Sequence, residues 1–233
     1  MNRVTTGIPG LDAVMDGGFL AGSVNLISGG TGTGKTIFAS QFLWEGLKKG
    51  ESCVYITLEE DPEDIKEDVA NFGWDFASYE KKGLFKIIYH DPAQVNNLGA
   101  IIISELEGIN AKRLVIDSIS IMELAINEPS KIRKRIFNLI NAIKRKEKCT
   151  TVLLSEIPED SKALSRYGVE EFVADSVTIL SYLGIGEEYN RSLMVRKMRR
   201  TNHGKDVYPF EISSKGIGVK RSEDKYSLSE RKK

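Results

Sequence analysis

The chain has 233 residues, of which 41% are hydrophobic and 28% charged, a balance that indicates one large globular domain with a sizeable core. The 33 basic and 33 acidic residues give a formal net charge of zero, which argues against a protein whose whole surface attracts nucleic acid but leaves a local basic patch open. No apolar run approaches the ~20 residues of a membrane helix, and residues 1–6 hold no apolar signal-peptide core, so we expect a cytoplasmic protein with no membrane partner.

Strand-like and helix-like patterns alternate through residues 24–155. Apolar, β-branched runs predict buried strands, and most are followed by a stretch with helical spacing of its apolar residues. This alternation is typical of an α/β fold with a mostly parallel central sheet and helices on both faces. The predicted strands cover residues 24–28, 53–57, 84–89, 113–117 and 150–155, and the predicted helices cover 35–49, a stretch beginning at Pro62, 98–107 and 130–148.

The alternation of strand-like and helix-like patterns stops after Asp175. Strand-like runs at 177–180, 192–195 and 208–212 follow one another with no long helix between them, and residues 184–188 have the composition of a turn. We therefore expect antiparallel strands added at the C-terminal edge of the sheet.

The domain organisation is predicted to be simple. No convincing linker and no internal repeat interrupts residues 1–219, which we predict to form a single domain. The segment 220–233 is charged and poor in apolar residues. It is therefore predicted to be a disordered tail.

A glycine-rich loop follows the first predicted strand. Residues Gly29 to Thr36 read Gly-Gly-Thr-Gly-Thr-Gly-Lys-Thr and satisfy the Walker A spacing, in the strand–loop–helix context that this motif requires. Glycines let consecutive backbone N–H groups face inward around a phosphate, and the positive end of the following helix points at the same anion. Lys35 can reach the β- and γ-phosphates. The predicted phosphate-binding residues are Gly29, Gly30, Thr31, Gly32, Thr33, Gly34, Lys35, Thr36 and Ile37.

A magnesium site is predicted from two positions. The Thr36 hydroxyl can bind Mg²⁺ directly, and Asp117 ends the buried apolar run 113–117, as the carboxylate of a Walker B strand does. Many strands end in aspartate, so the second pattern is weak alone, but its distance from the glycine-rich loop is suitable. The two motifs together predict a magnesium–nucleotide site.

Two adjacent glutamates, Glu59 and Glu60, follow the second predicted strand. A hydrolytic site needs a group that orients and deprotonates the attacking water, and a carboxylate at the end of the strand beside the loop strand could reach it. Repulsion between neighbouring carboxylates can raise one pKa and favour proton acceptance. The alternative is that the pair only begins the acidic helix face of residues 61–68. Ser155, at the end of the fifth predicted strand, could sense the γ-phosphate, although a lone serine indicates little.

With these residues assembled, the chain resembles the RecA-like P-loop ATPases, and within them the KaiC-type ATPases and their single-domain archaeal and bacterial homologues. The resemblance covers about residues 4–219. It implies a RecA-like P-loop NTPase fold, ATP as the nucleotide, Mg²⁺-dependent hydrolysis, and subunits assembled into a ring, usually a hexamer, with nucleotide at the interfaces. It rests on segments 5–12, 17–19 and 22–23 before the loop, and on 58–65, 114–118, 167–175, 197–204 and 209–212 after it.

The resemblance also implies roles for single residues. Lys35 and Glu59 would be catalytic, with Glu60 supporting Glu59 or sharing its role, a choice that spacing alone does not make. The segment 197–204 is similar to the subunit-interface motif of the family, which implies that basic residues there reach the nucleotide of a neighbouring subunit and stabilise charge on its γ-phosphate. The residues that match this motif are Lys197, Met198, Arg199, Thr201 and His203.

From the residues alone, the same basic cluster admits other interpretations. Arg196, Lys197, Arg199 and Arg200 lie on or beside a predicted strand, where positive charge can keep an edge strand soluble or form a nucleic-acid patch. Alternation along a strand would place Lys197 and Arg199 on one face and the other two on the opposite face.

The chain departs from the resemblance in two respects. KaiC itself carries two such domains in tandem, whereas this chain has one. The phosphorylating KaiC domain has a Ser-Thr pair that falls, in this register, on Glu171 and Phe172. Neither residue accepts phosphate, so autophosphorylation at that site is not expected.

Three functions fit these observations. The first is an ATPase that acts as a ring-forming regulatory switch with an unidentified protein partner. The second is a DNA-handling recombination ATPase of the RecA and RadA kind, favoured by the basic residues of the predicted helix 130–148 but disfavoured by the neutral net charge. The third, a nucleotide-binding scaffold that does not hydrolyse, is disfavoured by the intact set of Lys35, Thr36, Asp117 and the glutamate pair.

Overall fold

The computed structural model describes residues 1–124, 126, 128–146, 148–159, 161–182 and 190–220. The segment predicted as a turn, 184–188, lies outside these residues, as does the predicted tail beyond Lys220. Within the described part of the chain, the strands form one nine-stranded sheet and one two-stranded sheet.

The large sheet has a parallel part and an antiparallel part. The parallel strands are β3 (Val24–Gly29), β4 (Cys53–Thr57), β5 (Phe85–Tyr89), β6 (Arg113–Asp117), β7 (Thr150–Glu156) and β8 (Ser176–Tyr182). The antiparallel strands are β9 (Arg191–Met198), β10 (Tyr208–Ser213) and β11 (Gly216–Val219). The strand order is β11-β10-β9-β8-β3-β7-β6-β4-β5, and β1 (Arg3–Val4) pairs separately with β2 (Phe19–Leu20).

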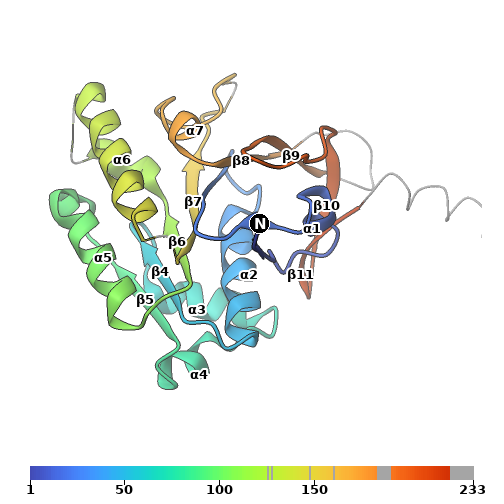
Figure 1. Ribbon diagram of the computed structural model, residues 1–233, viewed down its shortest axis with the longest axis horizontal. Helices are drawn as coiled ribbons and strands as arrows, with labels where there is room; N and C mark the ends of the chain where they lie inside the picture. The colour runs from blue at the N-terminus through green and yellow to red at the C-terminus, as the bar shows by residue number, and fades with distance from the viewer. Residues whose placement is uncertain (125, 127, 147, 160, 183–189, 221–233) are drawn as a thin grey trace, which may run out of the picture.

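Helices lie on both faces of this sheet (Figure 1). One face is covered by α2 (Lys35–Lys48), α3 (Pro62–Ala70) and α4 (Phe76–Lys81), and the other by α5 (Leu98–Gly108) and α6 (Pro129–Lys144). The short elements are α1 (Leu11–Val14), α7 (Glu170–Val173) and the 3₁₀ helices η1 (Pro92–Asn97) and η2 (Ile119–Leu124). None of the helices in the described residues is long and apolar enough to cross a membrane.

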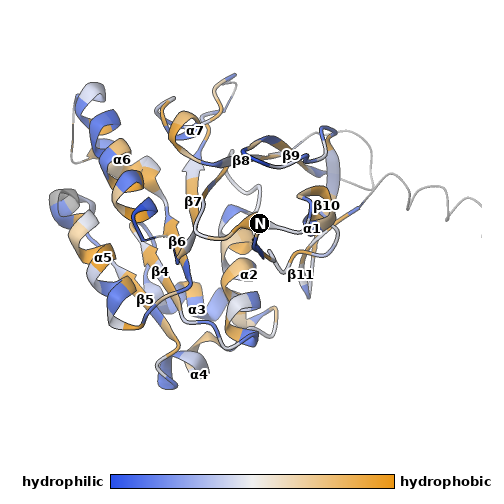
Figure 2. Cartoon of the chain, in the orientation of Figure 1, coloured by the Kyte–Doolittle hydropathy of each residue, from blue (hydrophilic) through white to orange (hydrophobic). Residues whose placement is uncertain are grey.

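The apolar pattern of the sequence explains this layering. All residues of β3 and β4 are buried, because helices cover both faces of a parallel sheet. The α6 helix has apolar residues toward the sheet and polar ones outside, and Figure 2 shows largely hydrophobic central strands beside it. The predicted apolar stripe of α6 is buried as expected: Ile132, Ile136, Leu139, Ile140 and Ile143.

The start of α3 also follows its local sequence. Pro62 occupies the first turn, where its missing N–H group has no helical partner to lose. The Asp61 side chain accepts a hydrogen bond from the backbone N–H of Glu63 at 2.8 Å, which caps the helix. This cap fixes the point at which the chain leaves the Glu59–Glu60 turn and enters the helix.

The predicted α/β fold is confirmed, with a mostly parallel sheet, helices on both faces and antiparallel strands at the C-terminal edge. Two details differ. The β8 strand pairs parallel with β3, so antiparallel pairing begins only at β9. The α6 helix ends at Lys144 rather than at residue 148, because the chain turns there to enter β7, with hydrogen bonds from Lys146 N to Ile143 O and from Cys149 N to Lys146 O.

The parallel strands define two opposite edges of the sheet. We call the side of the sheet at which the parallel strands end the carboxyl edge, and the side at which they begin the amino edge. Both differ from the C-terminal edge, which is the lateral side of the sheet formed by β9, β10 and β11. In the strand register, Gly29 lies level with Glu156 and Thr57 lies level with Asp117. The ends of β3, β7, β6 and β4 therefore bring the glycine-rich loop and several carboxylates together at the carboxyl edge.

Candidate active site

The glycine-rich loop runs from the end of β3 to the start of α2. Gly32 and Gly34 have φ angles of 71° and 98°, in the left-handed region that other residues disfavour. A Cβ atom at Gly34 would also stand 2.9 Å from the Ile212 side chain. The loop therefore needs glycine there, and it leads into the N-terminus of α2, whose unpaired N–H groups favour an anion.

The remaining loop residues have distinct environments. The buried Thr33 hydroxyl donates a hydrogen bond to the Gly30 carbonyl at 2.8 Å and stabilises the turn. Thr31 is exposed, and Ile37 packs partly buried against the core from α2. Among the predicted phosphate-binding residues, the side chain of Ile37 thus has a packing role.

Lys35 is held within the loop itself. Its Nζ donates hydrogen bonds to the carbonyl oxygens of Gly29 at 3.1 Å and Gly30 at 2.9 Å, and only 9% of the residue is exposed. The Glu156 carboxylate lies 3.8 Å from the same nitrogen. Sequence reasoning missed Glu156, although its place at the end of the strand after Ser155 was a usable signal. It adds a carboxylate to the predicted site.

The outer side of the loop is held by β8 and β9. The Tyr182 hydroxyl donates a hydrogen bond to the Gly32 carbonyl at 2.9 Å. The Arg191 guanidinium lies 4.8 Å from the centre of the Tyr182 ring and donates to the same carbonyl at 3.3 Å. Neither residue was predicted, because only the pairing of β3, β8 and β9 brings the two strand ends to the loop.

Thr36 and Asp117 meet as the sequence predicts. The Thr36 hydroxyl donates a hydrogen bond to Asp117 Oδ2 at 2.9 Å. Burial raises the pKa of Asp117, while hydrogen bonds from Tyr55 and Thr36 and the charge of Lys35 act to lower it. The Asp117–Ser118 peptide bond is cis.

The chemistry of this pair fits a magnesium ion. A hydroxyl and a carboxylate are hard oxygen ligands of the kind Mg²⁺ prefers. No cluster of three or more His, Cys, Asp or Glu that could hold a metal by itself occurs in the described residues. A cation here would therefore take its other ligands from water and phosphate, as Mg²⁺ in nucleotide sites usually does.

Glu59 lies in a turn that packs against the Walker B strand. The Thr57 hydroxyl accepts a hydrogen bond from the Glu60 N–H at 3.0 Å, and Leu58 N donates to Asp117 O at 2.7 Å. The Glu59 carboxylate accepts a hydrogen bond from the Ser118 hydroxyl at 2.7 Å. Desolvation raises the pKa of Glu59, with a further contribution from nearby carboxylates.

Glu60 has a different electrostatic setting. Desolvation raises its pKa, and the charges of Asp117 and of the α3 residues Asp68 and Asp64 raise it further. Asp117 acts on both glutamates, but Glu59 also interacts with Glu156 and Lys35. The structure thus distinguishes two glutamates that spacing leaves equivalent.

Ser155 is engaged by the protein itself. Its buried hydroxyl donates a hydrogen bond to the Glu170 carboxylate at 3.1 Å and accepts one from Arg166 N at 3.0 Å. Glu170, which is fully buried, also accepts from the Ser165 hydroxyl at 2.8 Å. The serine therefore ties the end of β7 to the first residue of α7 and to the segment before it.

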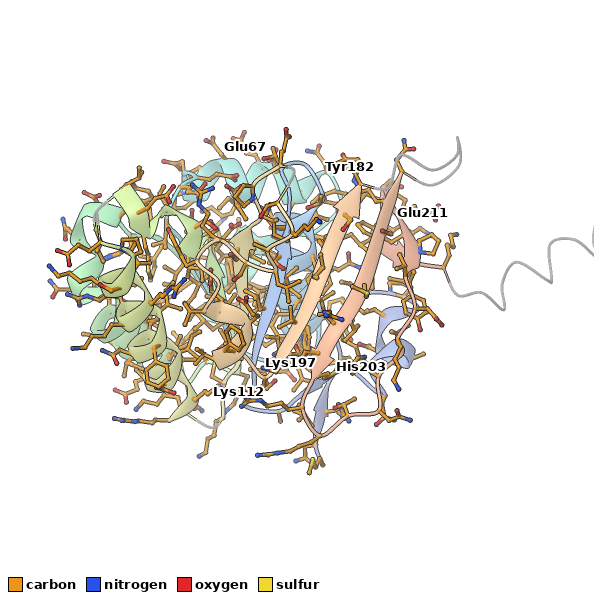
Figure 3. All side chains as sticks on the ribbon, turned by 90° about the horizontal axis from the view of Figure 1, so that it is seen from above. Glu67, Lys112, Tyr182, Lys197, His203 and Glu211 are labelled. Carbon is orange, nitrogen blue, oxygen red and sulfur yellow. The ribbon has the colours of Figure 1, made fainter. Side chains whose placement is uncertain are left out.

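The predicted interface residues lie at the amino edge. Met198 is level with Ser176 on β8, which is level with Asn25 on β3. Asn25 precedes Gly29 by four residues, which at about 3.3 Å per residue is roughly 13 Å along the strand. Figure 3 shows Lys197 and His203 at the opposite end of the β8–β9 pair from Tyr182.

Lys197 and Arg199 rest on backbone carbonyls of their own chain. Lys197 Nζ donates to the carbonyls of Glu171 and Ala174, each at 2.8 Å, and Arg199 donates to the Phe172 carbonyl at 3.1 Å. Desolvation lowers the pKa of Lys197, and the positive charge of Arg199 lowers it further. The two side chains therefore gather on one face, as alternation along the strand predicts.

The other residues of the predicted interface motif differ in exposure. The Met198 side chain is 7% exposed and belongs to the core, so only its backbone is available to a ligand. The Thr201 hydroxyl accepts a hydrogen bond from Arg3 at 2.9 Å, and His203 Nδ1 lies 2.7 Å from the Gly204 carbonyl oxygen. Arg200 has a φ of 56° and lies in the turn beyond β9.

Comparison with known proteins bears on this site. The chain matches the family described as "ATPase: KaiC" over residues 4–224. It is 39% identical over 234 residues to the UPF0273 protein PH0284 of Pyrococcus horikoshii, with 93% of each chain covered. It is 37% identical over 228 residues to the circadian clock oscillator protein KaiC of Synechococcus elongatus, of which it spans 44%.

A solved structure agrees with these sequence matches. The KaiC-like protein PH0186 from Pyrococcus horikoshii superposes with a TM-score of 0.86 and 44% sequence identity, covering 94% of this chain and 99% of that chain. The fold and the loop define a RecA-like P-loop ATPase. The chain belongs to the KaiC ATPase family.

Proposed function

We propose that this chain hydrolyses the γ-phosphate of Mg²⁺-bound ATP, and that it does so as a ring-forming regulatory switch. The supporting observation is that the strand register brings Lys35, Thr36, Asp117 and Glu59 together at the carboxyl edge. These are the group types that phosphoryl transfer needs: a cation for phosphate, ligands for a metal and a carboxylate for water.

In the proposed mechanism, Lys35 exchanges its carbonyl partners for the β- and γ-phosphates. Thr36 and Asp117 would hold Mg²⁺, and the bound ion would supply positive charge to the phosphate oxygens. Glu59 orients the attacking water and accepts its proton. Support for Glu59 over Glu60 comes from its hydrogen bond to Ser118, next to Asp117, and from its electrostatic interaction with Lys35. A carboxylate with a raised pKa is a better proton acceptor near neutral pH.

In the proposed ring, each nucleotide site receives further positive charge from the neighbouring subunit. Lys197 is level with Val177 near the start of β8, and Arg199 N donates to the carbonyl of Asp175 just before it. Both residues therefore lie at the amino edge, too far from their own glycine-rich loop to reach it. In a head-to-tail assembly they reach the nucleotide of the next subunit and stabilise charge on its γ-phosphate. A hexamer is the assembly we propose, with a protein partner that reads its nucleotide state.

DNA handling is the second candidate. The exposed Arg133 and Lys134 on α6 favour it. Three other basic residues of this region are already paired with acids, which weakens it. The pairs are Lys131 with Glu128, Lys144 with Asp175 and Lys146 with Glu107. Salt-dependent DNA binding that stimulates hydrolysis would favour this candidate over the switch.

A mixing experiment tests the shared site. Lys35→Ala subunits lack the lysine that binds phosphate but keep Arg199. Arg199→Ala subunits keep Lys35 but lack the arginine. If sites form between subunits, neither variant alone releases phosphate from ATP, but their mixture does. Light scattering with and without Mg²⁺–ATP gives the mass of the assembly in the same samples.

Two controls define the outcome. Arg133→Ala removes an exposed arginine from α6 and should hydrolyse ATP like the wild type. A mixture no more active than its separate components, formed from subunits that do assemble, would exclude the shared site. Wild-type protein that releases no phosphate in any assembly state would exclude hydrolysis itself.

A further inference from the structure

Tyr55 lies in the middle of β4, with its side chain fully buried in the core beneath α2. Its hydroxyl donates a hydrogen bond to Asp117 Oδ2 at 2.6 Å. The same oxygen accepts the hydrogen bond from the Thr36 hydroxyl at 2.9 Å. The carboxylate is therefore held from two sides, by a loop residue and by a core residue.

A tyrosine at this buried position needs a hydrogen-bond partner for its hydroxyl, which a phenylalanine would not need. A buried hydroxyl is unfavourable unless it forms a hydrogen bond, whereas the ring alone would fill nearly the same space. The phenol is the donor of this pair, because an ionised carboxylate only accepts hydrogen bonds. Asp117 is the acceptor that the structure gives it, so the contribution of the hydroxyl lies in that contact.

The contact restricts how Asp117 faces the glycine-rich loop. With Oδ2 occupied by Thr36 and Tyr55, rotation of the carboxylate about its Cβ–Cγ bond would break two hydrogen bonds. Oδ1 makes no hydrogen bond within the described residues, and it stays available to the water shell of a cation. The Thr36 hydroxyl can donate its proton to Oδ2 while its lone pairs face a metal.

We propose that Tyr55 is a positioning residue for the magnesium site, which holds Asp117 so that Oδ1 and the Thr36 hydroxyl face the same cation. This inference rests on the proposed function, because it takes Thr36 and Asp117 to be the metal-binding residues. Removing a group that orients a metal ligand typically weakens metal binding by about 10–100-fold. Tyr55→Phe should leave metal-free nucleotide binding unchanged, because Lys35 and the loop bind phosphate without Asp117.

The test measures Mn²⁺ in place of Mg²⁺, because the electron paramagnetic resonance signal of free Mn²⁺ reports binding directly. Wild type, Tyr55→Phe and Tyr79→Phe are titrated with Mn²⁺ in the presence of the β,γ-imido analogue of ATP. Nucleotide affinity without metal is measured with a fluorescent ATP analogue in EDTA. Tyr79→Phe is a matched control, because Tyr79 packs edge-on against Trp44 under the same face of the sheet.

The expected result is Mn²⁺ affinity about tenfold weaker in Tyr55→Phe, with Tyr79→Phe equal to the wild type and metal-free affinity unchanged in both. In an Asp117→Asn background, Tyr55→Phe should have little further effect, because the carboxylate it positions is absent.

Three results would overturn the inference. If Tyr55→Phe binds Mn²⁺ as the wild type does, the tyrosine does not position the metal site, and the proposed function still stands. If Tyr55→Phe loses metal-free nucleotide affinity in the same proportion, the residue supports the whole loop instead. If the wild type binds neither nucleotide nor Mn²⁺, the proposed function fails together with this inference.

Discussion

The carboxyl edge and the amino edge of the sheet carry complementary chemistry. At the carboxyl edge, Lys35 and several carboxylates surround a loop built for an anion. At the amino edge, Lys197 and Arg199 extend from the end of β9 and rest on carbonyls of residues 171–174. One subunit thus holds both halves of the proposed site at opposite ends. A face-to-face dimer joins like surfaces, whereas a head-to-tail contact joins the two unlike edges and, where the rotation between subunits closes, forms the ring that we propose.

We expect the largest loss of hydrolysis when the Arg199 side chain is removed from the amino edge. Arg199→Ala should lower phosphate release by about 10³-fold or more, the usual range for an arginine supplied to a transferring phosphoryl group. Nucleotide binding, measured by fluorescence of a labelled ATP, should survive, because the glycine-rich loop is untouched. Unchanged hydrolysis in this variant would mean that each subunit works alone.

The next largest loss of hydrolysis is expected from a substitution at the carboxyl edge. Glu59→Gln should lower phosphate release by about 10²–10⁴-fold, the usual contribution of a general base, with ATP still bound. Glu60→Gln is the matched control and should have a clearly smaller effect, since Glu59 accepts the Ser118 hydrogen bond and interacts with Lys35. The charges that raise the pKa of Glu60 are those of Asp117 and of carboxylates that include the α3 residues Asp68 and Asp64. Equal losses in the two variants would show that the glutamates share the role.

The pH dependence sharpens the role of Glu59. Because desolvation raises its pKa, the rate should fall on the acid side at a pH above the ordinary range of a glutamate, as the base becomes protonated. The Ser118 hydrogen bond stabilises the ionised carboxylate and lowers the pKa. Ser118→Ala should therefore move the acid limb of the rate profile to higher pH. A profile that does not move would exclude Glu59 as the titrating group.

The smallest expected effect is on stability, and it comes from a residue that supports the fold at the carboxyl edge without taking part in the proposed chemistry. Asp61→Ala removes the cap of α3 and should lower the free energy of unfolding by about 1 kcal/mol, as measured in denaturant. Hydrolysis at a temperature well below unfolding should change little. Glu67→Ala alters an exposed position within the same helix and leaves the cap intact, so it should be closer to the wild type in stability.

The fold was predictable where burial leaves a local signature. The strands β3, β4, β6 and β7 are covered on both faces, so their sequences are nearly continuous apolar runs, and their bounds agree with prediction to within a residue. Other elements depend on distant contacts. The β11 strand forms only because β10 lies beside it. The end of α6 is set by the turn into β7, and helical spacing contains no information about that turn.

The arrangement of the candidate site was predictable where a motif is contiguous. Lys35, Thr36 and the glycines lie in one segment, and Asp117 ends an apolar run. Glu156, Tyr55 and the Tyr182–Arg191 pair belong to four other strands, and the register between strands brings them to the loop. Tyr55 also looks like any core aromatic residue until its hydroxyl is placed beside Asp117.

Although the net charge of the chain is zero, three glutamates and three basic residues lie at opposite ends of the strands. Glu59, Glu60 and Glu156 lie at the carboxyl edge, and Lys197, Arg199 and Arg200 lie at the amino edge. Subunits stacked head to tail would bring opposite charges together, and exposed charges are screened over about 10 Å at 0.1 M salt. An assembly built this way would tighten in dilute buffer and loosen in concentrated salt, even with the same nucleotide bound.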